Sequence, residues 1–350
     1  MIARSFVSVS PSAFLSAFIS TLSSLSSLTS PLAALPPLAA ALSIALLTST
    51  AASAAEPPGD ATAATEAWRT KRAADLVKPD GWLTVAGLSF LQPGVNTIGT
   101  DPASDIVLPA NAAPATVGRL TLEQGRVWLD LASGVQAKAN DQAVTGRTEL
   151  RLANSAERRP ADRIAVGRVI FHLHHSGDRV AVRLRDPESP LLKHFAGLRW
   201  FPIDPAWRIT GRFVPYDAPR TVTVQNVLGD TEDSISPGEV EFTANGQTLR
   251  LVAFKAGERL SFVFRDATAG VDTYRIRFLS ADAPDANGQV TLDFNRAYNP
   301  PCAYNPYTTC PLPPPQNRLK IAIAAGEKNY VAQHSDTSAA TPEGTKRAGR

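Results

Sequence analysis

The stretch VEFTANGQTLRLVAF, residues 240–254, predicts an antiparallel hairpin both from its turn and from its alternation of apolar and polar residues. Asn245-Gly246 is the dipeptide that tight two-residue hairpin turns favour, because both positions need a positive φ. A turn at this point places Phe242 opposite Leu249, so the apolar side chains of both strands share one face. The stretch therefore predicts a sheet with one buried face and one polar face.

The segments that follow repeat the same pattern. Apolar and polar residues alternate in 260–264, 274–278 and 290–294, which is the period of a strand with one buried face. By the same parity a polar set shares the opposite face, namely Thr273, Arg275, Arg277, Thr291, Asp293 and Asn295. An antiparallel meander with a dense polar face is expected.

A second hairpin is predicted upstream, with its turn at Gly177-Asp178. This register places Phe171 opposite Leu184 on an apolar face and His172 opposite Arg183 on the other face. Several shorter strand patterns precede it, so the N-terminal half is also predicted to be β structure.

One helix is predicted before the strands, because Trp68, Arg72 and Leu76 recur at helical spacing until Pro79-Asp80-Gly81 stops the pattern. The fold class is all-β, with a β-sandwich-like domain followed by an antiparallel sheet or partly closed barrel. The expected organisation is a signal peptide (1–55), a linker (56–62), the helix and sandwich-like domain (63–190), the second β domain with a strap rich in proline and cysteine (191–330) and a disordered tail (331–350).

The first 55 residues differ in composition from the rest, since Ser, Ala and Leu dominate and Arg4 is their single charge. An apolar run followed by small residues predicts a signal peptide cleaved after Ser53-Ala54-Ala55. A membrane anchor is the competing interpretation, but prolines interrupt the segment and its apolar core is shorter than the roughly 20 residues of a span. We therefore expect a periplasmic or secreted protein with no stable membrane insertion after cleavage.

Charge gives little indication of a macromolecular partner. The 350 residues hold 35 basic and 32 acidic side chains, a formal charge of +3. This near balance gives no electrostatic case for nucleic acid or an acidic membrane surface. A small-molecule ligand is the expected partner, no cofactor is expected, and the sequence does not indicate an oligomeric state.

The segment 293–319, DFNRAYNPPCAYNPYTTCPLPPPQNRL, is here called the strap. Its prolines prevent it from continuing a helix or a central strand, so it is expected to run as an irregular segment held by side chains. It contains both cysteines of the chain, Cys302 and Cys310. In an exported protein such a closely spaced pair is expected to form a disulfide.

The sequence lacks the motifs of common enzyme classes, including G-x-S-x-G, H-E-x-x-H, the P-loop, G-x-G-x-x-G and C-x-x-C. His172 and His174 would project from one strand face and could hold a metal with a third ligand. A solvated or interfacial strand face beside Arg183 is favoured instead, so no metal site is predicted. Residues 266–272 resemble a calcium loop only loosely, and a plain turn is favoured there as well.

The strongest candidate site is a polar set in and near the strap. Arginine offers a planar fork for an anion, and Asp and Asn can orient it. The predicted ligand-binding residues are Arg277, Asp293, Asn295, Arg296, Asn299 and Asn317. An equally weighted alternative is that they hold the strap in place by hydrogen bonds. A hydrolase or lyase using Asp293 or Glu327 as acid or base is the second hypothesis, and a structural or partner-binding module is the third.

Residues 94–99, 104–108 and 129–134 resemble parts of the forkhead-associated fold, a β-sandwich that binds phosphothreonine. The phosphate-binding Ser and His of that family have no counterpart near 117–122. The resemblance therefore implies a sandwich of similar layout without phosphopeptide binding.

The chain as a whole resembles a family of unknown function, the domain of unknown function 1684. The resemblance rests on GWLTVAGL (81–88), FAGLRWF (195–201), DFNRAYNPPC (293–302) and AGEK (325–328), and it covers roughly residues 68–330. The signature residues of the family include the polar set and the cysteine pair, which implies a shared site that extends to Glu327. Since the family has no assigned activity, the resemblance implies no reaction.

Overall fold

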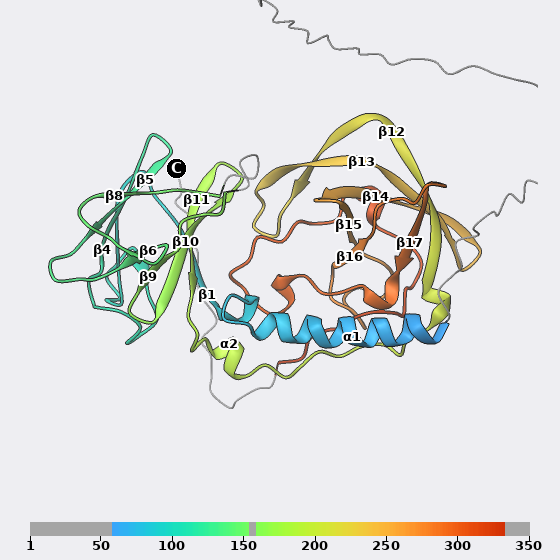
Figure 1. Ribbon diagram of the computed structural model, residues 1–350, viewed down its shortest axis with the longest axis horizontal. Helices are drawn as coiled ribbons and strands as arrows, with labels where there is room; N and C mark the ends of the chain where they lie inside the picture. Colours follow the sequence, from blue (N-terminus) through green and yellow to red (C-terminus); the bar gives the residue numbers. More distant parts are fainter. Residues whose placement is uncertain (1–57, 154–158, 333–350) are drawn as a thin grey trace, which may run out of the picture. The chain divides into compact units, whose positions relative to one another are not determined.

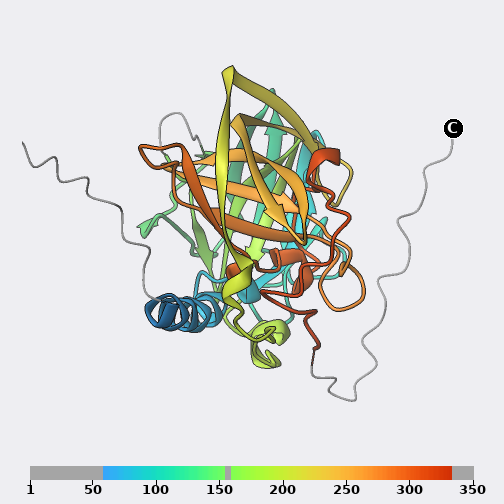
Figure 2. The same cartoon turned by 90° about the vertical axis from the view of Figure 1, so that its right-hand side faces the viewer.

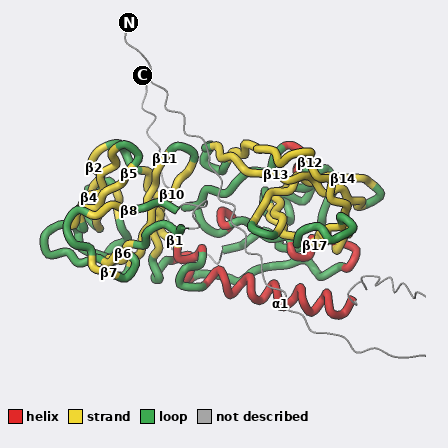
Figure 3. Tube along the Cα trace, turned by 45° about the horizontal axis from the view of Figure 1, so that its top comes forward, coloured by secondary structure: helices red, strands yellow, loops and turns green. Residues whose placement is uncertain are grey.

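The computed structural model describes residues 58–153 and 159–332, and most of its regular structure is strand (Figures 1 and 3). The predicted signal peptide, 1–55, and nearly all of the predicted tail, 331–350, lie outside the described residues. Several antiparallel sheets follow one leading helix, so the all-β prediction is confirmed. Within the described part of the chain, no helix combines the length and apolar character that crossing a membrane requires.

The leading helix α1 spans Pro58–Val77 and begins within the segment for which composition predicted a linker. Proline suits a first helical turn, where its missing N–H costs no bond, and Asp60 in the same turn complements the helix dipole. The helix ends close to the predicted stop. Gly81 is needed just beyond it, because a Cβ at this position would lie 2.3 Å from the carbonyl oxygen of Leu76.

The N-terminal β region contains two sheets. The five-stranded sheet has the order β3-β2-β4-β5-β8. Its strands are β2 (Gly94–Gly99), β3 (Ile106–Val107), β4 (Gly118–Glu123), β5 (Arg126–Leu131) and β8 (Thr148–Leu150). The six-stranded sheet has the order β1-β11-β10-β9-β6-β7. Its strands are β1 (Val85–Phe90), β6 (Lys138–Ala139), β7 (Gln142–Ala143), β9 (Ile164–Val166), β10 (Val169–Ser176) and β11 (Arg179–Arg185).

These two sheets share one apolar core, as a sandwich does. Ile98, Leu120 and Leu129 from the first sheet cluster with Phe171 and Leu184 from the second, and all five are buried. The predicted register of the β10–β11 hairpin is confirmed, including the pair of His172 and Arg183 on the opposite face. The more specific resemblance to the forkhead-associated fold stays a prediction.

The C-terminal sheet curls into a half-barrel with the strand order β16-β15-β14-β13-β12-β17 (Figure 2). Its strands are β12 (Arg208–Gln225), β13 (Thr231–Ala244), β14 (Gln247–Ala256), β15 (Arg259–Phe264), β16 (Arg277–Ala281) and β17 (Gln289–Asp293). The β13–β14 register pairs Phe242 with Leu249, as predicted. Because β16 and β17 are the two edges of the sheet, no ladder of hydrogen bonds closes the barrel between them, although the two strands lie close together.

One strand parity was predicted wrongly. In β16 the buried residues are Arg277, Leu279 and Ala281, so Arg277 faces the interior, whereas Phe278 is only partly buried. The alternation in 274–278 predicts instead that Phe278 faces the interior and Arg277 lies on the polar face. The guanidinium is accepted inside because Asp266 and the carbonyl groups of Ile323 and Ala325 bind it.

The remaining elements are short. The helix α2 covers Pro190–Lys193, and the described residues contain five short turns of 3₁₀ helix. They are Trp82–Thr84, Pro205–Trp207, Phe294–Arg296, Pro301–Ala303 and Pro315–Asn317. The last three lie in the strap, and the segment directly after it places Ile321, Ile323 and Ala325 in the half-barrel core. The strap is therefore anchored by apolar packing at its end.

Candidate functional site

The predicted ligand-binding residues separate into two groups. Asp293, Asn295 and Arg296 lie together on the turn that follows β17, at one edge of the half-barrel. Arg277, Asn299, Asn317 and the candidate acid Glu327 are at most 1% exposed and bind other parts of the protein. The sequence placed all of them near the strap, but only Asp293 and Arg296 line the hollow described next. Asn295 is 2% exposed and binds Asp293 and the backbone of Asp204.

A hollow of about 550 Å³ lies next to the first group. Its walls come from α1 and from the two barrel edges, which α1 passes on the outside (Figures 1 and 2). The lining residues are Trp68, Lys71, Arg72 and Asp75 of α1, and Arg208, Arg259, Ser280, Ala281, Asp282, Thr291, Asp293, Arg296 and Tyr298 of the half-barrel and strap. The open side of the barrel is therefore accessible to solutes of small-molecule size.

Asp293 is the best-connected carboxylate of the hollow. Its Oδ2 lies 3.4 Å from Nε of Arg296 and 3.6 Å from Nη1 of Arg208, and it accepts a 3.3 Å hydrogen bond from the Thr65 hydroxyl. Its Oδ1 accepts hydrogen bonds from the backbone and side-chain nitrogens of Asn295, both at 3.1 Å. Asp293 thus orients two guanidinium groups at the wall of the hollow.

The hollow carries more positive than negative charge. Five of its lining residues are basic, whereas three are acidic, namely Asp75, Asp282 and Asp293. The guanidinium carbon of Arg72 lies 4.6 Å from the ring centroid of Tyr298, and Trp68 lies 5.8 Å from the same ring. The Nε of Arg72 is buried without a hydrogen-bond partner. Aromatic faces next to an excess of guanidinium groups favour an anion that carries an apolar part.

Glu327 does not line this hollow. It is 1% exposed and accepts hydrogen bonds from the backbone and side-chain nitrogens of Asn299, both at 3.0 Å, and from the Tyr304 hydroxyl. Burial raises the pKa of Glu327 and raises that of Tyr304 well above its usual value. Because the carboxylate is enclosed, it has no access to a solute in the hollow.

Arg277 and Asn317 hold the strap and the segment after it. Arg277 is 1% exposed and pairs with Asp266, and burial lowers its pKa. The backbone N–H of Val252 donates to Oδ1 of Asn317 at 2.7 Å. The Nδ2 of Asn317 donates to the carbonyl oxygens of Val252 at 3.0 Å and Val263 at 2.9 Å. These contacts clamp the strap to β14 and β15.

No bond joins Cys302 and Cys310 in the structure, where both are free thiols, so the disulfide stays a prediction. The backbone N–H of Cys302 donates to Sγ of Cys310 at 3.3 Å, so the two residues are adjacent. A hydrogen bond from the Cys310 thiol lowers the pKa of Cys302 to about 7, and the same interaction raises the pKa of Cys310. The two thiols are therefore adjacent and differ in acidity.

The loop 266–272 forms a turn, as favoured. Both the backbone N–H and the hydroxyl of Thr268 donate to Oδ1 of Asp266, at 2.9 and 2.6 Å. The other oxygen of Asp266 binds Arg277. Over residues 58–153 and 159–332, no group of three or more His, Cys, Asp or Glu side chains is arranged to hold a metal ion.

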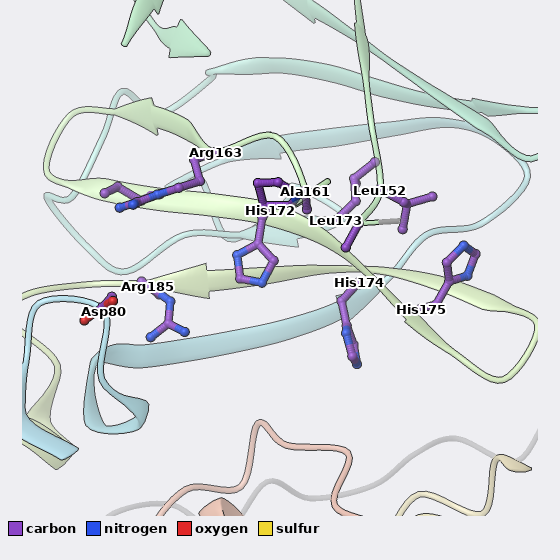
Figure 4. A pocket seen from close by; sticks show the side chains of 12 residues that line it. Asp80, Leu152, Ala161, Arg163, His172, Leu173, His174, His175 and Arg185 are labelled. Carbon is purple, nitrogen blue, oxygen red and sulfur yellow. The ribbon is translucent and has the colours of Figure 1, made fainter. Parts of the chain in front are cut away.

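The histidine cluster lines a second hollow, of about 500 Å³, in the sandwich region (Figure 4). His172 and His174 project from β10, and Nε2 of His174 lies 3.0 Å from the hydroxyl of Thr309 in the strap. Burial and the nearby charge of Arg183 lower the pKa of His172 to about 4 and that of His174 to about 3. Both imidazoles are therefore neutral at ordinary pH.

The sequence did not identify several residues of the first hollow. Lys71 and Arg72 come from α1, whose helical spacing was predicted without its contact to the half-barrel. Arg208 is paired with Asp293 across β12 and β17. Only the pairing of β12 with the distant strand β17 could have indicated that contact, since the two strands are about 80 residues apart in the chain.

These features define an all-β protein with a curled C-terminal half-barrel and an open polar hollow at its edge. The family described as "Protein of unknown function (DUF1684)" matches residues 193–328, which include the half-barrel and most of the first hollow. The chain belongs to this family.

Two further comparisons add no function. Among solved structures, the chain is similar to an uncharacterised protein of Haloarcula marismortui determined by solution NMR. The two are 32% identical over 41% of this chain and 80% of that chain, with a TM-score of 0.34. A comparison with curated proteins finds no match.

Proposed function

We propose that the protein binds a small anionic molecule in the hollow between α1 and the open side of the half-barrel. The observation that carries the proposal is the excess of guanidinium and ammonium groups around a hollow of about 550 Å³. Arg296 and Arg208 are held by Asp293, which fixes their direction, and both side chains line the hollow. Arg208 and Arg296 are about one-third exposed, so solvent reaches both.

The aromatic wall adds a requirement on the ligand. Trp68 and Tyr298 form a surface on which a planar or apolar group can pack, beside Arg72. An anion attached to an aromatic ring would use both features, whereas inorganic phosphate would use only the charges. Phenyl phosphate is therefore a suitable probe.

The test is a thermal shift measurement with phenyl phosphate, inorganic phosphate and phenol. We expect a rise in Tm with phenyl phosphate, a smaller rise with inorganic phosphate and none with phenol, because a ligand stabilises the state that binds it. Arg296→Ala should abolish the rise. Arg212→Ala is the matched control, since Arg212 lies on the same strand as Arg208 but pairs with Glu241 on the exposed surface. An equal rise in both variants would contradict the proposal.

Neither alternative hypothesis is favoured by a specific observation. Of the two candidate acids, Asp293 lines the hollow but all its neighbours are donors that favour its role as an orienting group. Glu327 is enclosed. The large apolar side chains that are exposed in the described part of the chain lie on separate elements, such as Val95, Leu228 and Val271, which does not favour a partner-binding patch.

Export is part of the proposal, and its basis is the composition of residues 1–55. We expect the purified mature protein to begin at Glu56 when it is expressed with its leader in a bacterial host. N-terminal sequencing of protein from the periplasm or medium measures this directly. A chain that starts at Met1 and stays in the cytoplasm would contradict it.

A further inference from the structure

The polar face of β10 and β11 concentrates positive charge. Arg183 and Arg185 project from β11 on the same face as His172. Arg163 lies just before β9, and Figure 4 shows it together with Arg185 and His172. Among the described residues, no carboxylate oxygen comes within 4.0 Å of these three guanidinium groups. Like charges side by side on a sheet destabilise the folded state. The three neighbouring guanidinium groups therefore lower the free energy of unfolding unless an anion binds between them.

Burial makes this cost larger. Arg183 is 6% exposed, and its guanidinium carbon lies 5.3 Å from the Trp82 ring centroid. Its Nη2 donates to the Thr309 hydroxyl at 3.3 Å, but its Nε is buried without a hydrogen-bond partner. Arg185 donates through Nη1 to the carbonyl of Gly81 at 2.6 Å and to a neighbouring hydroxyl. Neutral groups therefore make the direct hydrogen bonds to both side chains, and the more distant carboxylates of Asp80 and Glu232 offset only part of their charge.

The second hollow lies directly at this face. His172, Arg163 and Arg185 line one part of it, and Figure 4 shows their side chains around the same space. Asp80 is the one acidic residue among the described residues that line it. Two neutral imidazoles beside guanidinium groups can donate to or accept from a ligand without adding charge.

The rest of the wall is apolar. Leu152, Pro160 and Ile170 line the same hollow. A volume of about 500 Å³ is within the range of small-molecule sites, which combine apolar walls with a few polar groups that fix orientation. The wall therefore suits a ligand with an apolar body and one charged end.

We propose that this hollow is a second binding site, separate from the hollow beside α1, and that it takes a small organic carboxylate whose anionic end lies between Arg163, Arg185 and His172. A carboxylate is the group that matches the planar guanidinium fork and that the protein itself does not supply here. The apolar body lies against Leu152 and Ile170. This site rests on its own residues and does not depend on the proposed function.

The test uses benzoate and hexanoate as probes, with benzamide and hexanamide as neutral counterparts of the same shape. Binding is measured by calorimetry, and the imidazole NMR signals of His172 and His174 report its location. We expect a carboxylate to shift both imidazole signals and to leave that of His194 unchanged. The amides should bind at least about tenfold more weakly, which is a typical contribution of one charge-assisted hydrogen bond.

Arg163→Ala is the variant of choice, because Arg163 is exposed and its removal leaves the core intact. We expect it to weaken carboxylate binding about tenfold or more. Arg119→Ala, an exposed arginine on β4 of the other sheet, is the matched control and should bind as the wild type does. The imidazole shifts of His172 and His174 should persist in Arg296→Ala, which separates this site from the hollow beside α1.

Three results would overturn the proposal. They are the absence of any imidazole shift with either carboxylate, equal binding of the amides, and unchanged binding in Arg163→Ala. A response to inorganic phosphate alone would likewise exclude an organic carboxylate as the ligand class. Unaltered Tm of the unliganded Arg163→Ala variant establishes that the variant is folded.

Discussion

Two arginine–aspartate pairs of the half-barrel have the same chemistry and opposite environments. The pair of Arg277 and Asp266 has side chains that are 1% and 0% exposed, whereas the pair of Arg296 and Asp293 has side chains that are 29% and 9% exposed. In the first pair the protein supplies partners to both guanidinium Nη groups, including the carbonyl of Ile323. In the second pair the guanidinium borders a hollow.

These two pairs show that residue type alone does not identify a binding site. A guanidinium whose donors all bind the protein stabilises the fold, and one whose donors partly face a hollow is available to a ligand. The buried pair and the open pair are therefore expected to respond differently to substitution, the first in stability and the second in ligand binding.

The largest effect is expected for Arg277→Ala. Removing one partner of a buried ion pair leaves the Asp266 carboxylate without its counter-charge, which typically costs about 3–5 kcal/mol in free energy of unfolding. Urea denaturation of the variant measures it. Arg275→Ala, two residues away and exposed, should change the free energy by less than about 0.5 kcal/mol. A loss below about 1 kcal/mol for Arg277→Ala would show that the pair does not hold the strap.

A smaller loss is expected for Asn317→Ala. Its side chain satisfies the N–H and the carbonyl of Val252 and the carbonyl of Val263. Each buried group left without a partner lowers the free energy of unfolding by about 1–3 kcal/mol. Water that enters the gap binds some of these groups and reduces the total loss. Urea denaturation measures the free energy of unfolding of Asn317→Ala. The variant Gln316→Ala, which changes the exposed neighbouring residue, is the control. Equal stability of the two variants would contradict the clamp.

A pH-dependent effect is expected from His172, because burial lowers its pKa from 6.5 to about 4. The unfolded chain binds this proton more readily than the folded chain does, so the contribution of His172 to stability is present above pH 6.5 and is lost as the pH falls toward 4. His172→Gln should reduce the fall in unfolding free energy across this window. An unchanged slope between the variant and the wild type would argue against a neutral, buried imidazole.

The smallest effect on stability is expected for Arg296→Ala. The pair is partly exposed, and such pairs contribute about 0–1 kcal/mol. Denaturation without ligand should therefore hardly distinguish this variant from the wild type, although its response to phenyl phosphate is lost. A destabilisation as large as that of Arg277→Ala would place Arg296 among the structural residues and remove it from the site.

The sequence predicted the local features well. Hairpin registers followed from turn dipeptides and alternation, as the pairs of Phe242 with Leu249 and Phe171 with Leu184 show. The turn that carries Asp293 and Arg296 lies beside a hollow, and its role as a binding site stays a prediction. These features depend on neighbours in the chain, which a sequence displays directly.

The features that failed depend on contacts between distant segments. Arg277 was assigned to the polar face, because parity does not reveal that Asp266 and the carbonyl of Ile323 would meet it inside the barrel. The wall that α1 provides through Arg72 was also not predicted. Both result from closure of the half-barrel and from packing against it, and neither leaves a local pattern in the sequence.

The most direct test of the central claim, that the turn of Asp293 and Arg296 borders an open anion-binding hollow, is a crystal structure of the protein with phenyl phosphate. We expect the phosphate within hydrogen-bond distance of Arg296 and Arg208 and the ring against Trp68 or Tyr298. A structure in which these side chains fill the hollow, or in which the phosphate binds only elsewhere, would contradict the account.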